Sequence, residues 1–157
     1  MSDAHARPRV LAVASGGGHW VQLMRLRPAF EGCDVTFVTV REQYRVDIPA
    51  GAAFEVVNDA TRWNKFGLLM LAWRLYRIIR RTKPDAIITT GAAPGFFALR
   101  IGAFLGIRTA WVDSIANVEE VSLSGRRIGP KATLWLTQWP HLEKSCGQGP
   151  SYRGAVL

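Results

Sequence analysis

The sequence predicts an α/β fold in which a single doubly wound parallel sheet carries helices on its faces. Three observations support this fold class. Buried-strand patterns rich in β-branched residues alternate with helical stretches along most of the chain. The first strand runs through a glycine turn into a helix, which is the start of a right-handed crossover unit. Finally, 157 residues with 48% hydrophobic and 20% charged side chains suit one globular domain with a real core.

The first strand–helix unit is the most informative stretch. A strand is predicted over residues 10–14, and a helix begins near His19. Between them stand three consecutive glycines: Gly16, Gly17 and Gly18. Glycines let a ligand approach the main chain, and the first turn of a helix attracts negative charge. The turn is therefore a candidate phosphate site, with a merely structural tight connection as the alternative. The dinucleotide fingerprint would need a glycine at Val21, and no P-loop lysine follows.

The remaining elements follow in order. Apolar, β-branched runs predict strands over residues 34–40, 54–57, 85–90, 107–113 and 134–137. One long helix is predicted from a cap at Asp59 or Thr61 to about Thr82, and an apolar helix over residues 96–105, closed by Gly106. In a parallel sheet the loops after the strands open at one edge, where ligands bind. These loops cover residues 15–19, 39–42, 90–95, 113–114 and 138–140.

The long helix has two different faces. One arc is apolar and suits packing on the sheet: Leu68, Leu71, Ala72, Leu75, Ile78 and Ile79. The opposite arc mixes large rings with arginines, which is typical of a helix that lies partly inserted in a membrane interface. We therefore predict a membrane-binding face made of Trp63, Phe66, Met70, Trp73, Arg74, Arg77, Arg80 and Arg81. A neighbouring loop or a partner protein that buries Trp63 and Trp73 is the alternative.

The net charge of +8 indicates an anionic partner. Basic residues gather in residues 62–83 and at Arg126, Arg127 and Lys131, without a zinc-finger spacing, an RNA-binding signature or a basic tail, so nucleic acid is not the expected partner. Two cysteines, Cys33 and Cys146, are expected to be reduced thiols. Residues 1–8 read as a loose tail without a signal-peptide core, and no stretch is long and apolar enough to span a bilayer.

Two side chains at the predicted ligand edge are candidates for acid–base chemistry. Histidine side chains are suited to acid–base catalysis near neutral pH, so His19 could act as a general base, or it could cap its own loop. Asp113 ends a buried strand beside Ser114 and could orient His19, take a proton, bind a sugar hydroxyl, or simply cap the next segment. Ser15 is not in a nucleophile elbow, and the sequence has no metal-binding motif.

Three segments together resemble a known family. They are SGGGHWVQLMRL, TTGAAPGFFALRIGAFLG and WVDSIANVEEVSLSGRRIGPKATLWLTQWPHLEK. The chain resembles, over nearly all of residues 10–157, the Alg-fourteen family of oligosaccharide-biosynthesis proteins, whose bacterial relatives include PssD and CpsF. The SLSGR and QWP segments are more specific than the glycine turn.

The resemblance implies that residues 9–157 form a Rossmann-like domain equivalent to the N-terminal, acceptor-side half of a GT-B glycosyltransferase, similar to the first domain of MurG. A separate subunit, resembling Alg-thirteen or PssE, would hold most of the UDP-sugar. The pair would act at the cytoplasmic face of the inner membrane on a polyprenyl-diphosphate-linked saccharide in exopolysaccharide or capsule synthesis, without metal or other cofactor. Eukaryotic members carry an N-terminal anchor, so here we expect residues 62–83 to attach the protein.

The resemblance also suggests roles for residues. His19 is the first choice for general base, or for a contact to the donor diphosphate together with Gly17 and Gly18, and Asp113 is the second choice for the base. The substrate pocket is expected to include Ser15, Gly16, Gly17, Gly18, Thr90, Gly91, Gly95 and Ser114. The partner is expected to dock on Gln138, Trp139 and Pro140. Two other functions stay open: a non-catalytic scaffold that tethers a complete transferase to the membrane, and, with less support, a dehydrogenase that binds NAD at the glycine turn.

Overall fold

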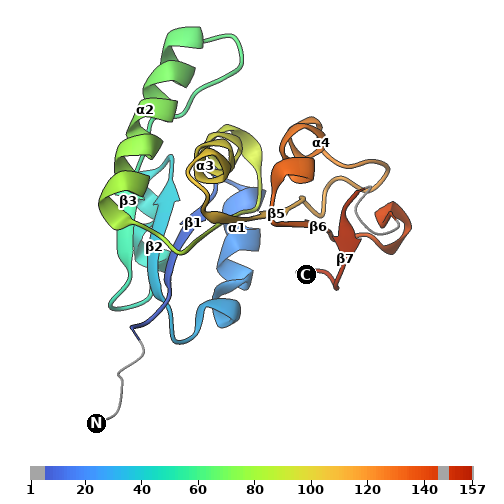
Figure 1. The fold of residues 1–157 in the computed structure, drawn as a ribbon, viewed down its shortest axis with the longest axis horizontal. Coiled ribbons are helices and arrows are strands. Elements are labelled where there is room, and N and C mark those ends of the chain that lie inside the picture. Colours follow the sequence, from blue (N-terminus) through green and yellow to red (C-terminus); the bar gives the residue numbers. More distant parts are fainter. Residues whose placement is uncertain (1–5, 145–148, 157) are drawn as a thin grey trace.

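The computed structural model describes residues 6–144 and 149–156, which form one parallel sheet with helices on both faces (Figure 1). The strand order is β3-β2-β1-β4-β5-β6-β7, and every neighbouring pair is parallel. The strands are β1 (Arg9–Val13), β2 (Asp34–Thr39), β3 (Ala53–Val56), β4 (Ala86–Thr89), β5 (Arg108–Val112), β6 (Leu134–Thr137) and β7 (Ser151–Tyr152). The predicted fold class is confirmed.

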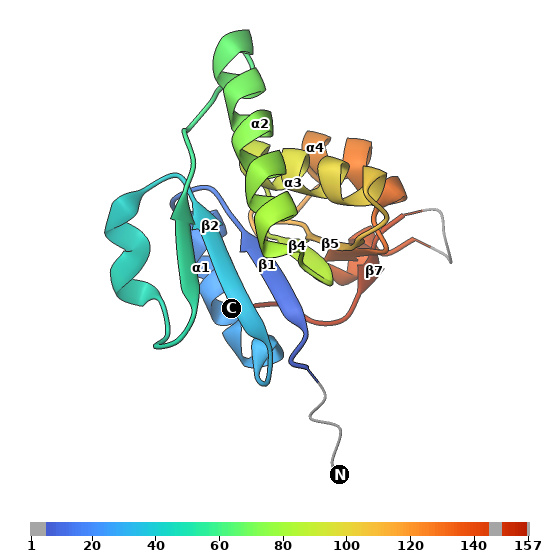
Figure 2. The ribbon, with the colours of Figure 1, turned by 60° about the vertical axis from the view of Figure 1, so that its left-hand side comes forward.

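The helices divide between the two faces of the sheet (Figure 2). They are α1 (Gly18–Arg25), α2 (Lys65–Thr82), α3 (Ala92–Phe104) and α4 (Leu123–Ile128). Short 3-10 turns connect them: η1 (Arg27–Phe30), η2 (Glu42–Asp47), η3 (Gly129–Lys131) and η4 (Pro140–Leu142). Helices α2, α3 and α4 pack on one face, and α1 packs on the other over β1 and β2.

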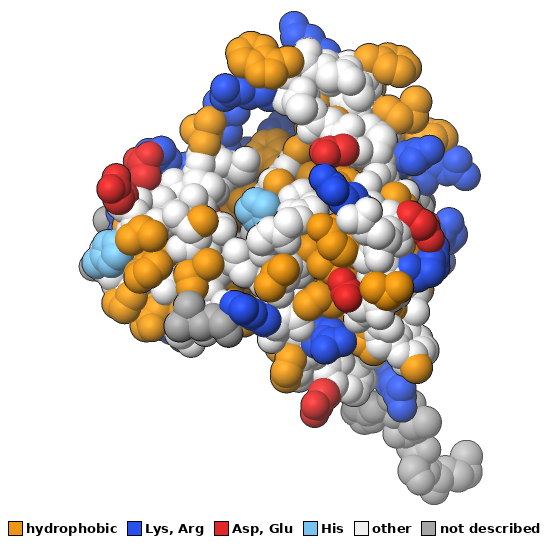
Figure 3. Space-filling model, turned by 180° about the vertical axis from the view of Figure 1, so that it is seen from behind, with side chains coloured by type: hydrophobic (Ala, Val, Ile, Leu, Met, Phe, Trp, Pro, Cys, Tyr) orange, Lys and Arg blue, Asp and Glu red, His pale blue; other side chains and the backbone are white. Residues whose placement is uncertain are grey.

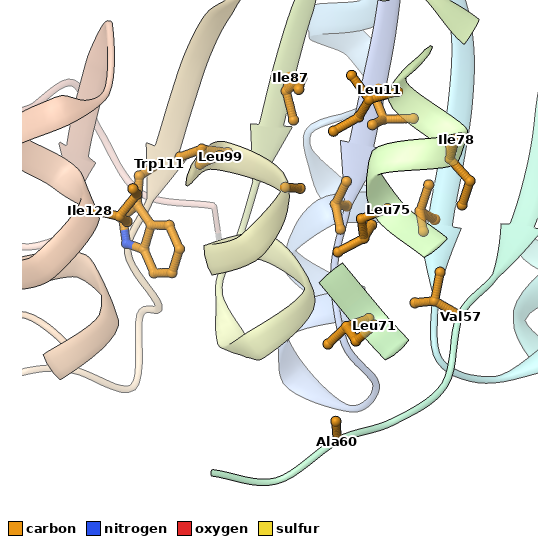
Figure 4. Packing of buried hydrophobic residues seen from close by; sticks show 14 residues of the cluster. Leu11, Val57, Ala60, Leu71, Leu75, Ile78, Ile87, Leu99, Trp111 and Ile128 are labelled. Atoms are coloured by element: carbon orange, nitrogen blue, oxygen red, sulfur yellow. The ribbon is translucent and has the colours of Figure 1, made fainter. Parts of the chain in front are cut away.

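The larger core lies between the sheet and the α2–α3–α4 layer (Figure 4). Leu11 and Ile87 from the strands meet Leu71 and Leu75 from α2, and each of these side chains is fully buried. The apolar arc of α2 predicted from its periodicity is confirmed at these leucines and at Ile79. The sheet thus holds α2 by its inner face only.

Two helix boundaries differ from those expected. The cap of α2 is Asn64, whose side chain accepts the N–H of Gly67 at 2.8 Å, and neither Asp59 nor Thr61 caps it. Helix α3 begins at Ala92, four residues earlier than residue 96. The sequence suggested a loop over residues 90–95, but Pro94 fits the first turn of a helix, where its missing N–H would have no partner.

Two elements were not expected at all. Helix α4 begins after Ser122, which caps it by accepting the N–H of Gly125 at 2.9 Å. Strand β7 adds two residues to the outer side of β6. Neither is long enough to show a periodic apolar pattern. Cys33 is a free thiol, whereas Cys146 and the first five residues of the predicted tail lie outside the described residues.

The N-terminal part of α2 extends beyond the sheet (Figures 1 and 2). It extends in the direction in which the strands point, so it projects past their carboxyl ends. In the described part of the chain, no helix combines the length and the apolar character that crossing a membrane requires.

Candidate functional site

His19 lies at the carboxyl edge of the sheet, bound to the loop after β4. Its Nδ1 is 2.8 Å from the carbonyl oxygen of Thr90, and the Thr90 hydroxyl donates to the His19 carbonyl at 2.6 Å. Gly91 follows with φ +126°, and a Cβ there would lie 2.9 Å from the imidazole ring. Both the backbone angle and the space beside the ring therefore require glycine at position 91.

This contact selects the tautomer of His19. A carbonyl oxygen can only accept, so Nδ1 carries the proton and donates it to Thr90. The other ring nitrogen, Nε2, is then unprotonated in the neutral imidazole. His19 is half-buried, and its ring orientation is held by the backbone of β4's loop. The geometry gives His19 what a general base needs, namely a free lone pair on a ring that is held in place.

The glycine turn is covered by two side chains from the loop after β2. The Tyr44 hydroxyl accepts the N–H of Gly17 at 2.8 Å, and a Cβ on Gly16 would lie 3.2 Å from both Nε of Arg41 and the Tyr44 hydroxyl. Tyr44 is itself stacked on the buried ring of Trp20, with centroids 5.0 Å apart. One N–H group of the turn is thus already hydrogen-bonded, and the Arg41 side chain places a positive charge next to the turn.

Arg41 and Tyr44 were not singled out from the sequence. Arg41 forms no ion pair with another described residue, so its charge is available to a ligand. Their position just after β2, next to β1 in the sheet, was a signal that could have found them, because neighbouring parallel strands end at the same edge. The predicted Ser15 hydroxyl is directed at its own loop, 3.5 Å from the Gly16 carbonyl.

Asp113 is buried and has all its partners in the segment that follows it. One carboxylate oxygen accepts the Ser114 N–H at 2.9 Å and the Asn117 amide at 2.6 Å, and the other accepts the Ser122 N–H at 3.0 Å and its hydroxyl at 3.3 Å. The carboxylate therefore shapes the β5–α4 connection. His19 is held by Thr90 instead, so an orienting contact from Asp113 to His19 is not what the structure shows.

The other predicted pocket and docking residues divide between surface and interior. Gly95 lies in the first turn of α3, where a Cβ would come within 3 Å of the Thr89 side chain, so its position serves close packing of α3 on β4. Ser114 and Gln138 are buried. Trp139 is half-buried and donates its indole N–H to the Ile115 carbonyl at 2.7 Å, while Pro140 is exposed. Docking of a partner here stays a prediction.

The predicted membrane-binding face of α2 is exposed. Trp63 and Phe66 are 82% and 74% exposed, and Leu69, which the sequence analysis left out, is 69% exposed. Figure 3 shows hydrophobic and Lys or Arg side chains gathered at the projecting end of the molecule. We call the exposed apolar residues of this end the α2 crest: Trp63, Phe66, Leu69, Met70 and Trp73.

The arginines of α2 lie farther along the helix, above the outer strand β3. They line a groove of about 820 Å³ between α2 and β3. Arg81 pairs with Glu55, and the Arg77 guanidinium stacks on Trp73 at 4.8 Å. Arg74 and Arg80 form no ion pair with a described residue. The groove thus has more positive than negative charge. It adjoins the α2 crest at Trp73, which belongs to both.

No family model matches the chain. Relatives are nevertheless found among characterised proteins. The UDP-N-acetylglucosamine transferase subunit ALG14 of Rattus norvegicus is 26% identical over 169 aligned positions, covering 86% of this chain and 77% of the relative. The ALG14 subunit of Yarrowia lipolytica is 33% identical over 87 positions, 52% of this chain and 40% of the relative. The resemblance to the ALG14 family is confirmed.

Solved structures show where the ALG14-like fold belongs. MurG of Acinetobacter baumannii superposes with a TM-score of 0.74 at 14% identity, over 92% of this chain and 45% of MurG. A UDP-N-acetylglucosamine 2-epimerase of Rickettsia bellii gives 0.70 at 9% identity, over 96% and 46%. The ALG14-like chain therefore has the GT-B type of fold and spans less than half of these proteins. Among the described residues no group of three His, Cys, Asp or Glu side chains could hold a metal ion.

Proposed function

We propose that this chain is the acceptor-side subunit of a two-component inverting glycosyltransferase. It would help to move a sugar from a UDP-sugar to a polyprenyl-diphosphate-linked saccharide in exopolysaccharide or capsule synthesis. The observation that carries the proposal is the His19–Thr90 contact, which leaves Nε2 free beside a glycine turn at the carboxyl edge of a GT-B-type half. Its similarity to subunits of a UDP-N-acetylglucosamine transferase supports the reaction class.

In the proposed reaction, Nε2 of His19 accepts the proton of an acceptor hydroxyl. The hydroxyl oxygen bonds to the anomeric carbon of the donor sugar while the bond from that carbon to the UDP oxygen breaks. UDP leaves with the electron pair, and the configuration at the carbon inverts. The Thr90 carbonyl, which already accepts from Nδ1, stabilises the imidazolium that forms. No metal is needed from this subunit.

A diphosphate would be held next to His19. The Arg41 guanidinium supplies positive charge above Gly16, and Gly18 begins helix α1, whose first N–H groups favour an anion. Gly17 offers its N–H only when the Tyr44 hydroxyl gives it up or shares it. We assign this contact to the acceptor's diphosphate, and the UDP-sugar to a donor-binding subunit that closes over the same edge. Asp113 has no part in this chemistry.

The membrane part of the proposal rests on where the α2 crest lies. The crest projects past the same edge of the sheet that holds His19 (Figure 1). Rings inserted at headgroup depth, with the arginines of α2 on lipid phosphates, would bring His19 close to the membrane surface. A lipid-linked acceptor could then reach the site without leaving the bilayer. We propose peripheral association at the cytoplasmic face.

A second function is a non-catalytic scaffold that tethers or activates a complete transferase. One observation favours it: the glycine turn is partly closed by Tyr44 and Arg41 of the same chain. If this function is the right one, the partner subunit alone transfers sugar at the full rate to a soluble acceptor, and substitutions at His19 do not change that rate.

The proposal is tested by His19→Asn in the pair reconstituted with its donor-binding subunit. Asparagine can still donate to the Thr90 carbonyl but has no basic nitrogen. We expect the turnover rate to fall by about 10²- to 10⁴-fold, the range for loss of a general base. His141→Asn is the matched control, because this exposed histidine also contacts a backbone carbonyl but lies away from the glycine turn. Equal rates for His19→Asn and wild type would remove His19 from the mechanism.

A further inference from the structure

Two buried glutamines join the helix that carries His19 to the other side of the sheet edge. Gln22 lies one turn after His19 on α1, and Gln138 directly follows β6; their side chains are 5% and 3% exposed. The Gln138 amide nitrogen donates to the Gln22 amide oxygen at 2.6 Å. Burying two amides is unfavourable unless their hydrogen bonds are made, so the partners of the pair matter.

Gln22 is tied to two separate segments. Its amide oxygen accepts the Ile115 N–H at 3.1 Å, and its amide nitrogen donates to the Gly18 carbonyl at 3.2 Å and to the Ser114 hydroxyl at 3.1 Å. A backbone N–H can only donate and a carbonyl can only accept, so the orientation of this amide is fixed. Gln22 therefore connects the residue before His19 to the loop after β5.

Gln138 is fixed in the same way. Its amide oxygen accepts the Val156 N–H at 2.8 Å, and its amide nitrogen donates to the Asp113 carbonyl at 2.9 Å as well as to Gln22. The sequence suggested Gln138 as a docking residue, but its side chain is directed inward. We call the two side chains together the glutamine clamp. The clamp joins α1, the loops after β5 and β6, and the segment that contains Val156.

The first turn of α1 has no side-chain cap. It begins in a glycine turn, and its cap residue Gly17 offers no side chain. Trp20, the residue after His19, is buried and donates its indole N–H to Asp47 at 2.8 Å, and Leu23 is buried in the next turn. The His19 turn is thus fixed by Thr90, by Trp20 and by the glutamine clamp. Loss of the clamp would remove one of these constraints, so that the His19 ring could shift without unfolding of the helix.

We propose that Gln22 and Gln138 are positioning residues for His19. The clamp fixes Nε2 of His19 relative to the loops after β5 and β6, which close the same edge of the sheet. The catalytic role of His19 in this inference rests on the proposed function, whereas the geometry of the clamp does not. A displacement of about 1 Å at a reacting group costs on the order of 100-fold in rate, so a buried amide pair that prevents it has a measurable effect.

The first test uses Gln22→Met, which keeps the length of the side chain but removes its hydrogen bonds. In the reconstituted pair we expect the turnover rate to fall by about 10- to 100-fold, with the KM of the acceptor nearly unchanged. Gln43→Met is the matched control, because Gln43 is an exposed glutamine on η2. A turnover rate like that of the control would overturn the proposal.

The second test needs no activity. In the isolated chain labelled with ¹⁵N-histidine, the His19 signals should show a single Nδ1–H tautomer, identified by their loss in His19→Asn. In Gln22→Met they should shift or broaden, while those of His141 stay. Unchanged His19 signals would contradict the positioning role. If the wild-type pair proves inactive, the proposed function fails, and this measurement still decides on the clamp.

The third test gives a result even if Gln22→Met folds poorly. Gln138→Glu places a carboxylate oxygen against two acceptors, the Asp113 carbonyl and the Gln22 amide oxygen. Burial and these acceptors raise the pKa of the introduced carboxyl, so the variant should lose stability as pH rises through that pKa and regain it, with the His19 signals, at lower pH. Equal stability of Gln138→Glu and wild type at neutral pH would show that the clamp is not formed as described.

Discussion

The glycine-turn edge and the α2 crest both lie at the carboxyl ends of the strands, but they differ in how their side chains are satisfied. At the edge, polar groups meet partners within the chain: Thr90 holds His19, and Tyr44 holds Gly17. At the crest, large rings such as Trp63 stay exposed although they are costly to leave in water. The edge is built to be rigid before a ligand arrives, whereas the crest is built to be covered by something else.

The largest effect on stability is expected at the inner face of α2. A comparison with the exposed face separates packing from function in that helix. Leu75 is fully buried, so Leu75→Ala should lower the free energy of unfolding by about 2 to 5 kcal/mol. Leu69→Ala on the exposed side of the same helix is the control and should change it by less than about 0.5 kcal/mol. Urea unfolding measures both. Similar losses would mean that Leu69 is buried in solution.

Gly91→Ala disturbs the glycine-turn edge by adding a single methyl group. The new methyl group would lie 2.9 Å from the His19 ring at φ +126°, so the ring must move. We expect the turnover rate of the reconstituted pair to fall by about 100-fold. Gly106→Ala is matched, because Gly106 also has a positive φ of +72° but no atom within 4 Å of the added methyl. If both variants lose activity equally, backbone strain causes the loss, and displacement of the His19 ring does not.

The α2 crest can be tested by vesicle binding. Trp63→Ala combined with Phe66→Ala should weaken partitioning onto vesicles that contain anionic lipid by at least about tenfold, since each inserted ring contributes on the order of 1 kcal/mol. Val46→Ala with Phe104→Ala is the control, because both residues are 88% exposed elsewhere on the surface. Equal binding of the two double variants would indicate that a protein partner covers the crest.

The smallest effect is expected far from both regions, at Asp85. The backbone N–H and the guanidinium of Arg9 lower the pKa of this exposed carboxyl. Because the pKa is lower in the folded state, the contact stabilises the protein at neutral pH, and its contribution is lost as pH falls through the folded pKa. Asp85→Asn should therefore lose slightly less stability than wild type between about pH 5 and pH 2. The urea midpoint as a function of pH measures this, with Asp59→Asn as control.

Periodic patterns carried most of the fold prediction. Strands β1 to β6 and the inner face of α2 follow from runs and spacings that a single sequence displays, and the structure confirms them. The start of α3 was missed because Pro94 is compatible with both a turn and a first helical turn. Strand β7 depends on pairing with β6 over two residues, which no local pattern announces.

Only part of the candidate site could be predicted from the sequence. His19 and the glycines were found because strand, turn and helix follow one another along the chain. Arg41 and Tyr44 reach the turn through the pairing of β2 with β1, which is a tertiary contact. For Asp113 the sequence left catalysis and capping both open, because its partners, among them Ser122, come from a loop whose folding the sequence does not reveal.

The central claim is that this chain supplies a base to a reaction that a second subunit completes. The most direct measurement is the rate of sugar transfer from a UDP-sugar to a lipid-diphosphate-linked acceptor. It is made with this chain alone, with its donor-binding partner alone, with both, and with both when this chain carries His19→Asn. We predict transfer at the full rate only by the intact wild-type pair. Full-rate transfer by either subunit alone would contradict the account.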